Sequence, residues 1–452
     1  MPVTASLDRR LGLTDAVVVG LGAMIGAGVF VAFAPATARA GSLVWISLAI
    51  AAVVAVCNAL SSARLAAQFP AAGGTYVYGR EMLGPLPGFL AGWGFVVGKT
   101  ASCAAMALTV GLYIWPEHAN LVAAAAVIAL TVLSVAGVQR TATVAKVLVA
   151  IVLAVLAVFL VLAWMAPAAG SGAGASVGAG AGVAGAGAEA VGAALAPAPA
   201  VDGQAWPARV LGVLGGAGFC FFAFAGYARI ATLGEEVREP ARTIPRAVVV
   251  AISMVIVVYA LVLIAIIHVL GVGGVASGSA PVLEAAERLG GGEFAPVVRI
   301  AAGIAALGAL LGGILGVSRT TLAMARDRHL PSRLAAVHPS TRTPYVAEIC
   351  VGVLVAVIVL LADVRQAIGF SSFAVLFYYL VANASALRMD RGRRRLPAWV
   401  PVLGGIGCVI VAGSLPWQSV VAGVVVVLGG GGLVYAVTRR GMVAPAGRSG
   451  QA

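Results

Sequence analysis

A glycine-rich segment near the N-terminus has the composition of an interrupted helix. It reads Gly20-Leu21-Gly22-Ala23-Met24-Ile25-Gly26-Ala27-Gly28-Val29-Phe30, with four glycines within nine residues, and glycine destabilises helix interiors. An interruption exposes amide N–H groups at the start of one half-helix and carbonyl groups at the end of the other. The amides can bind a carboxylate without a charged side chain, and the carbonyls can bind an ammonium group. A zwitterionic α-amino acid fits such a site.

Two other interpretations compete for this segment. Gly22 and Gly26 form a G-x-x-x-G pair, which is typical of close helix packing in membranes. A dinucleotide-binding glycine motif would need a preceding strand and a βαβ unit, and the sequence predicts neither. Taken alone, the segment fits helix packing and an interrupted helix about equally well.

A second segment favours the interrupted helix. Phe219-Cys220-Phe221-Phe222-Ala223-Phe224-Ala225-Gly226-Tyr227 places a glycine among aromatic residues inside another apolar stretch. The two segments occupy equivalent positions if the chain contains two repeats of five helices. Paired glycine-interrupted helices in corresponding halves are typical of transporters with inverted repeats.

One ionisable residue, Lys99, lies near the middle of a third apolar stretch, in Gly94-Phe95-Val96-Val97-Gly98-Lys99-Thr100-Ala101. Charged residues at membrane depth are costly and mark functional sites by default. A structural lysine would extend its side chain to the interface, but Lys99 is far from both ends of its stretch. We therefore expect a coupling role for Lys99.

The composition defines the setting of these residues. Hydrophobic residues make up 61% of the 452 residues, charged residues 10%, and mean hydropathy is +1.05, whereas soluble domains carry about 25% charged residues. The chain is therefore expected to be an all-α integral membrane protein that spans the lipid bilayer. The net charge of +13 is spread between apolar runs, which excludes nucleic acid as a partner and is typical of cytoplasmic loops.

The apolar runs are long and do not alternate, so they predict helices and not a β-barrel. Twelve transmembrane helices are expected, with approximate limits 12–38, 43–69, 87–113, 119–137, 143–166, 208–233, 246–272, 294–324, 345–363, 366–388, 398–414 and 418–438.

The distribution of basic residues predicts the orientation. With the N-terminus inside, cytoplasmic segments hold 21 of the 29 lysines and arginines and outer loops hold 5, so both termini are expected to be cytoplasmic. The predicted organisation is a cytoplasmic N-terminus (1–11), a first repeat (12–166), an Ala/Gly-rich outer loop (167–207), a second repeat (208–388), helices 11 and 12 (389–438) and a cytoplasmic tail (439–452).

The five cysteines all lie in apolar stretches without metal-ligand spacing. They predict buried thiols, no disulfide framework, no metal site and no cofactor.

Four features together resemble the amino acid–polyamine–organocation (APC) superfamily of permeases. They are the glycine-rich first span, the Phe-Ala-Phe-Ala-Gly-Tyr interruption, the loop Glu235-Glu236-Val237-Arg238-Glu239-Pro240-Ala241-Arg242-Thr243-Ile244-Pro245-Arg246, and the Ser318-Arg319…Ala325-Arg326-Asp327…Leu330-Pro331 loop. They occur in the family's order and spacing over most of the chain.

This resemblance implies a leucine-transporter-like 5+5 inverted repeat with broken helices 1 and 6. It also implies that Tyr227 takes the place of the family's aromatic gate residue. The implied substrate-binding residues are Ile25, Gly26, Ala27, Gly28, Phe222, Ala223, Phe224, Ala225, Gly226 and Tyr227.

The resemblance also bears on which ion is coupled to transport. In sodium-independent relatives a lysine on the fifth span can replace the sodium ion, but Val149 to Leu156 here contains no lysine. Lys99 is a candidate to supply that charge from another helix. The stretch Ala301 to Leu315 lacks the Ser and Thr hydroxyls that sodium-coupled relatives offer, so sodium would lack its usual ligands.

No acidic residue lies deep in a predicted span, so a cationic side chain would find no counter-ion. We therefore expect a plasma-membrane secondary transporter of neutral amino acids, which works by alternating access and is either proton-coupled or an exchanger. The alternatives are a permease of the same fold for cationic amino acids, polyamines or other amines, and a sensor that binds amino acids without transporting them.

Other classes fit less well. An enzyme would need a polar catalytic cluster at depth, and the spans offer almost no carboxylates and no H-x-x-x-H motif. A channel would need charged rings or a carbonyl filter, and ATP-driven transport would need a phosphate-binding loop.

Overall fold

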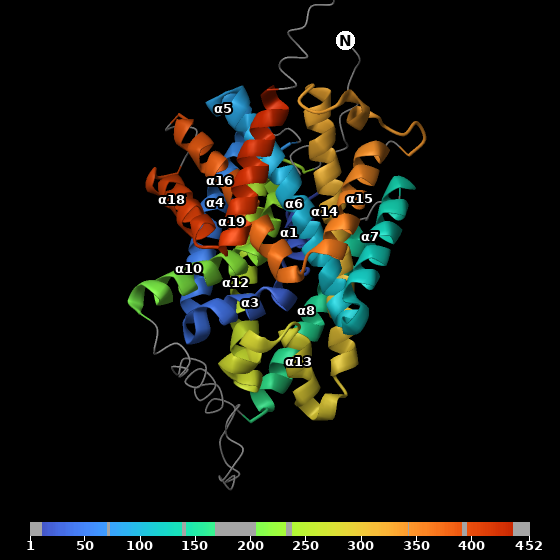
Figure 1. Cartoon of the computed structure of the whole chain (residues 1–452), viewed down its shortest axis with the longest axis vertical. Coiled ribbons are helices and arrows are strands. Elements are labelled where there is room, and N and C mark those ends of the chain that lie inside the picture. The colour runs from blue at the N-terminus through green and yellow to red at the C-terminus, as the bar shows by residue number, and fades with distance from the viewer. Residues whose placement is uncertain are drawn as a thin grey trace, which may run out of the picture.

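Apolar helices account for most of the chain (Figure 1). The computed structural model describes residues 11–69, 73–137, 142–167, 205–231, 237–341, 343–390 and 396–436. Within these ranges it contains no β-strand, and strand-like pairing is limited to one isolated bridge between Leu11 and Val237. An all-α membrane protein is therefore confirmed.

The principal helices follow the expected runs. They are α1 (Leu13–Met24), α2 (Gly28–Val31), α3 (Phe33–Ala40), α4 (Val44–Gln68), α5 (Thr75–Leu83), α6 (Pro85–Ile114), α7 (Ala119–Val135), α8 (Ala142–Met165), α10 (Trp206–Phe224), α11 (Ala228–Ala231), α12 (Pro240–Ser277), α13 (Pro281–Arg288), α14 (Ala295–Arg326), α15 (Tyr345–Leu361), α16 (Val364–Arg388), α18 (Trp399–Gly413) and α19 (Trp417–Gly423), which a π-helical turn (Val424–Gly430) extends.

Ten helical segments in the described part of the chain are long and apolar enough to cross a membrane. Two shorter apolar helices, α15 and α18, lie where the ninth and eleventh spans were expected. The chain is thus a multi-pass membrane protein, while the count of twelve spans and the inverted repeat remain predictions.

Both expected helix interruptions are present. α1 ends at Met24 and α2 begins at Gly28. α10 ends at Phe224, a 3₁₀ turn covers Ala225–Tyr227, and α11 follows. The glycine-rich composition therefore interrupts the helices and does not only provide a packing face.

Two short helices, α5 and α13, were not expected from the sequence. They lie at opposite ends of the bundle (Figure 1). α5 has nine residues and α13 has eight, which is too short to cross a bilayer. α12 also extends beyond its expected limits at both ends and bends at Gly271, whose φ is 72°. Such a φ is readily adopted by glycine.

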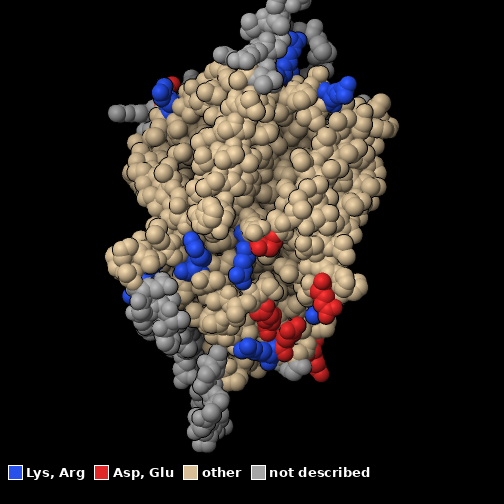
Figure 2. All heavy atoms as spheres, in the orientation of Figure 1, with Lys and Arg blue, Asp and Glu red and all other residues tan. Residues whose placement is uncertain are grey.

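The surface distribution of charge agrees with a membrane setting. Figure 2 shows charged residues near both ends of the visible face and an uncharged band between them. Four cysteines are buried as expected, but Cys350 is exposed on α15, because an apolar residue on an outer helix can face lipid as readily as the core. The predicted N-terminal segment, most of the Ala/Gly-rich loop, Glu235 and Glu236, and the C-terminal tail lie outside the described residues.

Candidate functional site

The two interruptions contact each other in the middle of the bundle. A Cβ atom at Gly28 would lie 2.6 Å from the Ala223 Cα, and one at Gly226 would collide with the carbonyl of Ala23. Only glycine permits this approach of two backbones. The structure therefore brings together the two halves of the expected substrate site.

The α1 interruption offers unused hydrogen-bond donors. Ile25 N–H donates to the Leu21 carbonyl, and helical bonding resumes with Phe30 N–H to the Ala27 carbonyl at 3.0 Å. Between them, the described part of the chain shows no backbone hydrogen bond from the amides of Gly26 or Ala27. Amides at the start of a half-helix are suited to bind an anion.

Three carbonyl groups at or near the interruptions accept hydrogen bonds from tyrosine side chains. The Tyr259 hydroxyl of α12 lies 2.6 Å from the Met24 carbonyl and 3.0 Å from the Ala223 carbonyl, and donates to this pair. The Tyr113 hydroxyl of α6 donates to the Phe30 carbonyl at 2.9 Å. The sequence did not predict a role for either tyrosine, because nothing in the surrounding sequence distinguishes them from other tyrosines in apolar helices.

Lys99 reaches the second interruption. Its Nζ donates to the Ala225 carbonyl at 3.1 Å, which follows directly after the end of α10. A cation is favourable at a helix C-terminus, where the helix dipole is negative. The structure thus places the expected intramembrane lysine beside the α10 interruption, where backbone carbonyl groups are the hydrogen-bond acceptors.

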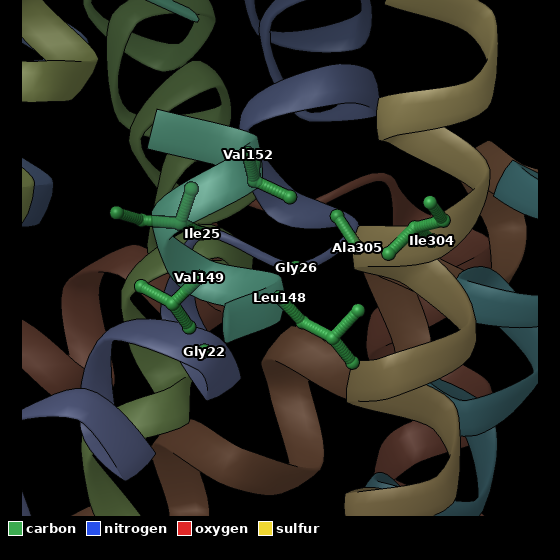
Figure 3. A pocket seen from close by; sticks show the side chains of 8 residues that line it. All are labelled: Gly22, Ile25, Gly26, Leu148, Val149, Val152, Ile304 and Ala305. Carbon is green, nitrogen blue, oxygen red and sulfur yellow. The ribbon is translucent and has the colours of Figure 1, made fainter. Parts of the chain in front are cut away.

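A small pocket adjoins the free amides (Figure 3). Its wall contains Gly22, Ile25 and Gly26 from α1, and residues of α8 and α14, namely Leu148, Val149, Val152, Ile304 and Ala305. The cavity volume is about 20 Å³, enough for about one water molecule and too small for an amino acid. None of these side chains carries an oxygen, so this wall supplies no side-chain ligand for sodium.

The aromatic half of the expected site is fully enclosed. Phe222 to Tyr227 are all buried. Tyr227 stacks on Tyr379 of α16 with ring centroids 4.9 Å apart, and Phe224 lies 5.0 Å from the Tyr259 ring. This packing leaves no open path past Tyr227, as a closed aromatic gate would require.

The end of the bundle that carries α5 is closed by polar contacts. The Tyr76 hydroxyl contacts Asp327 Oδ2 at 2.6 Å and His329 Nδ1 at 2.8 Å, and Arg80 pairs with Asp327. Burial lowers the pKa of His329, and Arg80 adds to this effect while Asp327 opposes it. Asp327 is thus bound by two residues of α5.

A second ion pair holds the start of α1. Asp15 lies 2.6 Å from Lys146 of α8 and accepts from the Gly12 amide. At the opposite end α13 packs against α2 and α12. Polar contacts and helix packing thus lie at both ends of the bundle, beyond the small cavity at the α1 interruption.

Comparison with known proteins agrees with this architecture. The amino acid permease family matches residues 11–437, and the chain belongs to this family. An uncharacterized transporter of Mycobacterium tuberculosis is 56% identical over 96% of this chain and 92% of its own length. A cationic amino acid transporter 7 of Arabidopsis thaliana is 28% identical over 84% and 66%, and the branched-chain amino acid permease BcaP of Bacillus subtilis is 24% identical over 92% and 90%. The chain is therefore a permease and not an enzyme.

Proposed function

We propose that this permease is a secondary active transporter that carries neutral amino acids by alternating access, either coupled to protons or as an exchanger. The observation that carries the proposal is the pair of facing interruptions. The free amides of Gly26 and Ala27 lie on one side, and Lys99 lies on the other.

Each part of the interruption has a proposed task. The amides at Gly26 and Ala27 bind the substrate carboxylate, with Ile25 and Gly28 shaping the turn. The segment from Phe222 to Gly226 contributes carbonyls for the ammonium group and apolar walls, and Tyr227 closes over it. Since backbone atoms make the polar contacts, the site recognises the part that all α-amino acids share.

The side chain of the substrate is proposed to be uncharged. The pocket wall is entirely apolar, and the Lys99 ammonium at Ala225 repels a second cation in a medium of low dielectric constant. The relative named for branched-chain amino acids agrees with this choice. The relative named for cationic amino acids keeps the alternative of cationic or amine substrates worth testing.

Lys99 is proposed as the fixed positive charge of the coupling machinery. A cation held at the end of α10 can take the place of a bound sodium ion. The side chains of the wall between α1, α8 and α14 carry no oxygen, so they offer sodium no ligand. Uptake is then expected to be independent of sodium.

Flux into proteoliposomes tests the function. The purified chain is reconstituted, and the uptake of each of the twenty labelled amino acids is measured with and without unlabelled amino acid inside. Accumulation of aliphatic neutral amino acids supports the proposal. Binding without any flux would instead favour the sensor, and uptake of lysine, arginine or a polyamine alone would overturn the neutral substrate.

The proposed location is the plasma membrane. We also propose that both termini are cytoplasmic, because this orientation would put 21 of the 29 lysines and arginines in cytoplasmic segments. In intact cells, an impermeant thiol reagent is expected to label Gly185→Cys from outside and to spare Arg393→Cys. Labelling of both positions from the same side would contradict this orientation.

A further inference from the structure

A buried carboxyl group lies away from the interruptions, on α15. The Glu348 side chain has 0% exposure, and the hydrogen-bond contact of its carboxyl group in the described part of the chain is with Ser134 of α7. A buried ionised carboxylate with so few partners costs more free energy than a neutral one, so the group takes up a proton instead. Glu348 therefore has the environment of a neutral carboxylic acid.

The neighbouring helix packs closely on this face of α15. Glu348 and Gly352 are four residues apart and share one face of α15. A Cβ atom at Gly352 would lie 2.7 Å from the Thr131 Cγ2 of α7. On that helix Ser134 is also buried, and its hydroxyl is close enough to hydrogen-bond the Glu348 carboxyl group. A buried hydroxyl and a buried carboxyl group thus lie together where α7 packs against α15.

The other elements packed against α15 are α14, α6 and the turn Ser332–Ala335. On α14, the Arg319 guanidinium acts electrostatically on Glu348 and favours its ionised form. Lys99 on α6 is directed to the Ala225 carbonyl, and Arg333 in the turn is exposed. Burial thus favours the neutral acid and Arg319 opposes it, so hydration of the carboxyl group is expected to favour release of the proton.

We propose that Glu348 is a proton-binding site of the transporter. The proposal rests on the proposed transport function and supplies its coupling ion. The carboxylate takes up one proton from the outer aqueous phase and is the neutral acid in the closed state. Separation of α7 from α15 then admits water and releases the proton to the cytoplasmic phase. Because Glu348 lies in the first turn of α15, beside the loop that follows α14, the proton has a short path to that end of the bundle.

Infrared spectroscopy tests the protonation directly. The wild-type protein at neutral pH is expected to show the carbonyl band of a protonated carboxyl group, and Glu348→Gln is expected to lose it. Glu117→Gln, which alters an exposed carboxyl group, is the matched control and keeps the band. A band that persists in Glu348→Gln would overturn the proposal.

Transport assays test the coupling. An inward proton gradient is expected to stimulate uptake by the wild type and by Glu117→Gln. Glu348→Gln loses this stimulation but retains exchange of labelled for unlabelled substrate, and Glu348→Asp restores stimulation. Gradient stimulation that is unchanged in Glu348→Gln, or absent from the wild type, would overturn the proton site. Failure of the proposed function itself looks different, because the wild type would then show no exchange at all.

Discussion

The two helix interruptions share a glycine-rich origin but differ in the polar groups that they expose. At the α1 interruption, the amides of Gly26 and Ala27 make no backbone hydrogen bond in the described part of the chain. At the α10 interruption, the Ala225 carbonyl accepts from Lys99 and the Ala223 carbonyl from Tyr259. The α1 interruption leaves two amides without a backbone partner in the described part of the chain, whereas side chains of the protein bind the carbonyl groups of the α10 interruption.

This difference indicates how the chain tolerates open backbone inside a membrane. Unsatisfied polar groups in hydrocarbon cost several kcal/mol each, so an interruption survives where other groups satisfy it. The carbonyls accept hydrogen bonds from Tyr113, Tyr259 and Lys99 on neighbouring helices, whereas the amides are proposed to bind the substrate carboxylate. Occupancy by substrate is thus expected to complete the polar contacts of the α1 interruption.

The largest effect is expected from filling the α1 interruption. Gly26→Leu should reduce uptake to background, because even a Cβ atom at Gly26 collides with Ala309 and a leucine side chain would block the amides. Uptake into proteoliposomes measures the effect, and size-exclusion chromatography checks that the variant folds. Gly312→Ala is the matched control, since a Cβ atom there meets nothing within 4 Å. Normal uptake by Gly26→Leu would contradict the binding role of the amides.

The next effect is expected from removing the cation at the α10 interruption. Lys99→Met preserves length and removes the charge, and should slow uptake about tenfold or more, because a hydrogen bond to a charged group contributes about 1.5–3 kcal/mol. Lys99→Arg, which keeps the charge, is expected to retain more activity than Lys99→Met. Wild-type rates in Lys99→Met, with or without sodium, would end the coupling role of Lys99.

The sequence predicted the interruptions well because their cause is local. Gly26 and Gly226 each lie in a long apolar run, and the low helix propensity of glycine acts within a few residues. Lys99 was equally visible, since a charge inside an apolar run needs a specific partner. What the sequence could not predict was that the partner would be the Ala225 carbonyl, because this contact joins residues 126 positions apart.

Burial of residues near the ends of the spans was harder to predict from the sequence than the interruptions were. Glu348 lies only one turn inside α15, where a carboxylate ordinarily reaches water, and the sequence therefore drew attention away from it. It is enclosed by the helices that pack against α15, and the close approach of Thr131 to Gly352 marks how tightly α7 lies against it. Tyr259 was missed for a related reason, because tyrosine is common in apolar helices and its hydroxyl becomes informative only when its acceptors are known.

A smaller effect is expected from Tyr259→Phe, which affects both interruptions at once. The Met24 and Ala223 carbonyls lose their shared donor, and a buried acceptor without a partner costs about 1–3 kcal/mol. The variant should unfold at a lower temperature in detergent and transport several-fold more slowly. Equal loss with Tyr378→Phe, whose hydroxyl contacts Thr75 near α5, would show that the effect is not specific to the interruptions.

The smallest effect is expected from Tyr113→Phe, which removes one donor from one half-helix. The Phe30 carbonyl loses its partner, but the acceptor lies after the α1 interruption, so the amides of Gly26 and Ala27 keep their geometry. The thermal unfolding temperature should fall less than in Tyr259→Phe, and the substrate concentration for half-maximal uptake should change little. If the two donors act independently, the double variant Tyr113→Phe/Tyr259→Phe should lose the sum of the two single effects. A larger loss would mean that the two interruptions are energetically coupled. Phe33 is the contact through which a change in α2 could alter the hydrogen bond to the Ala223 carbonyl, because its ring lies 5.9 Å from that of Tyr259.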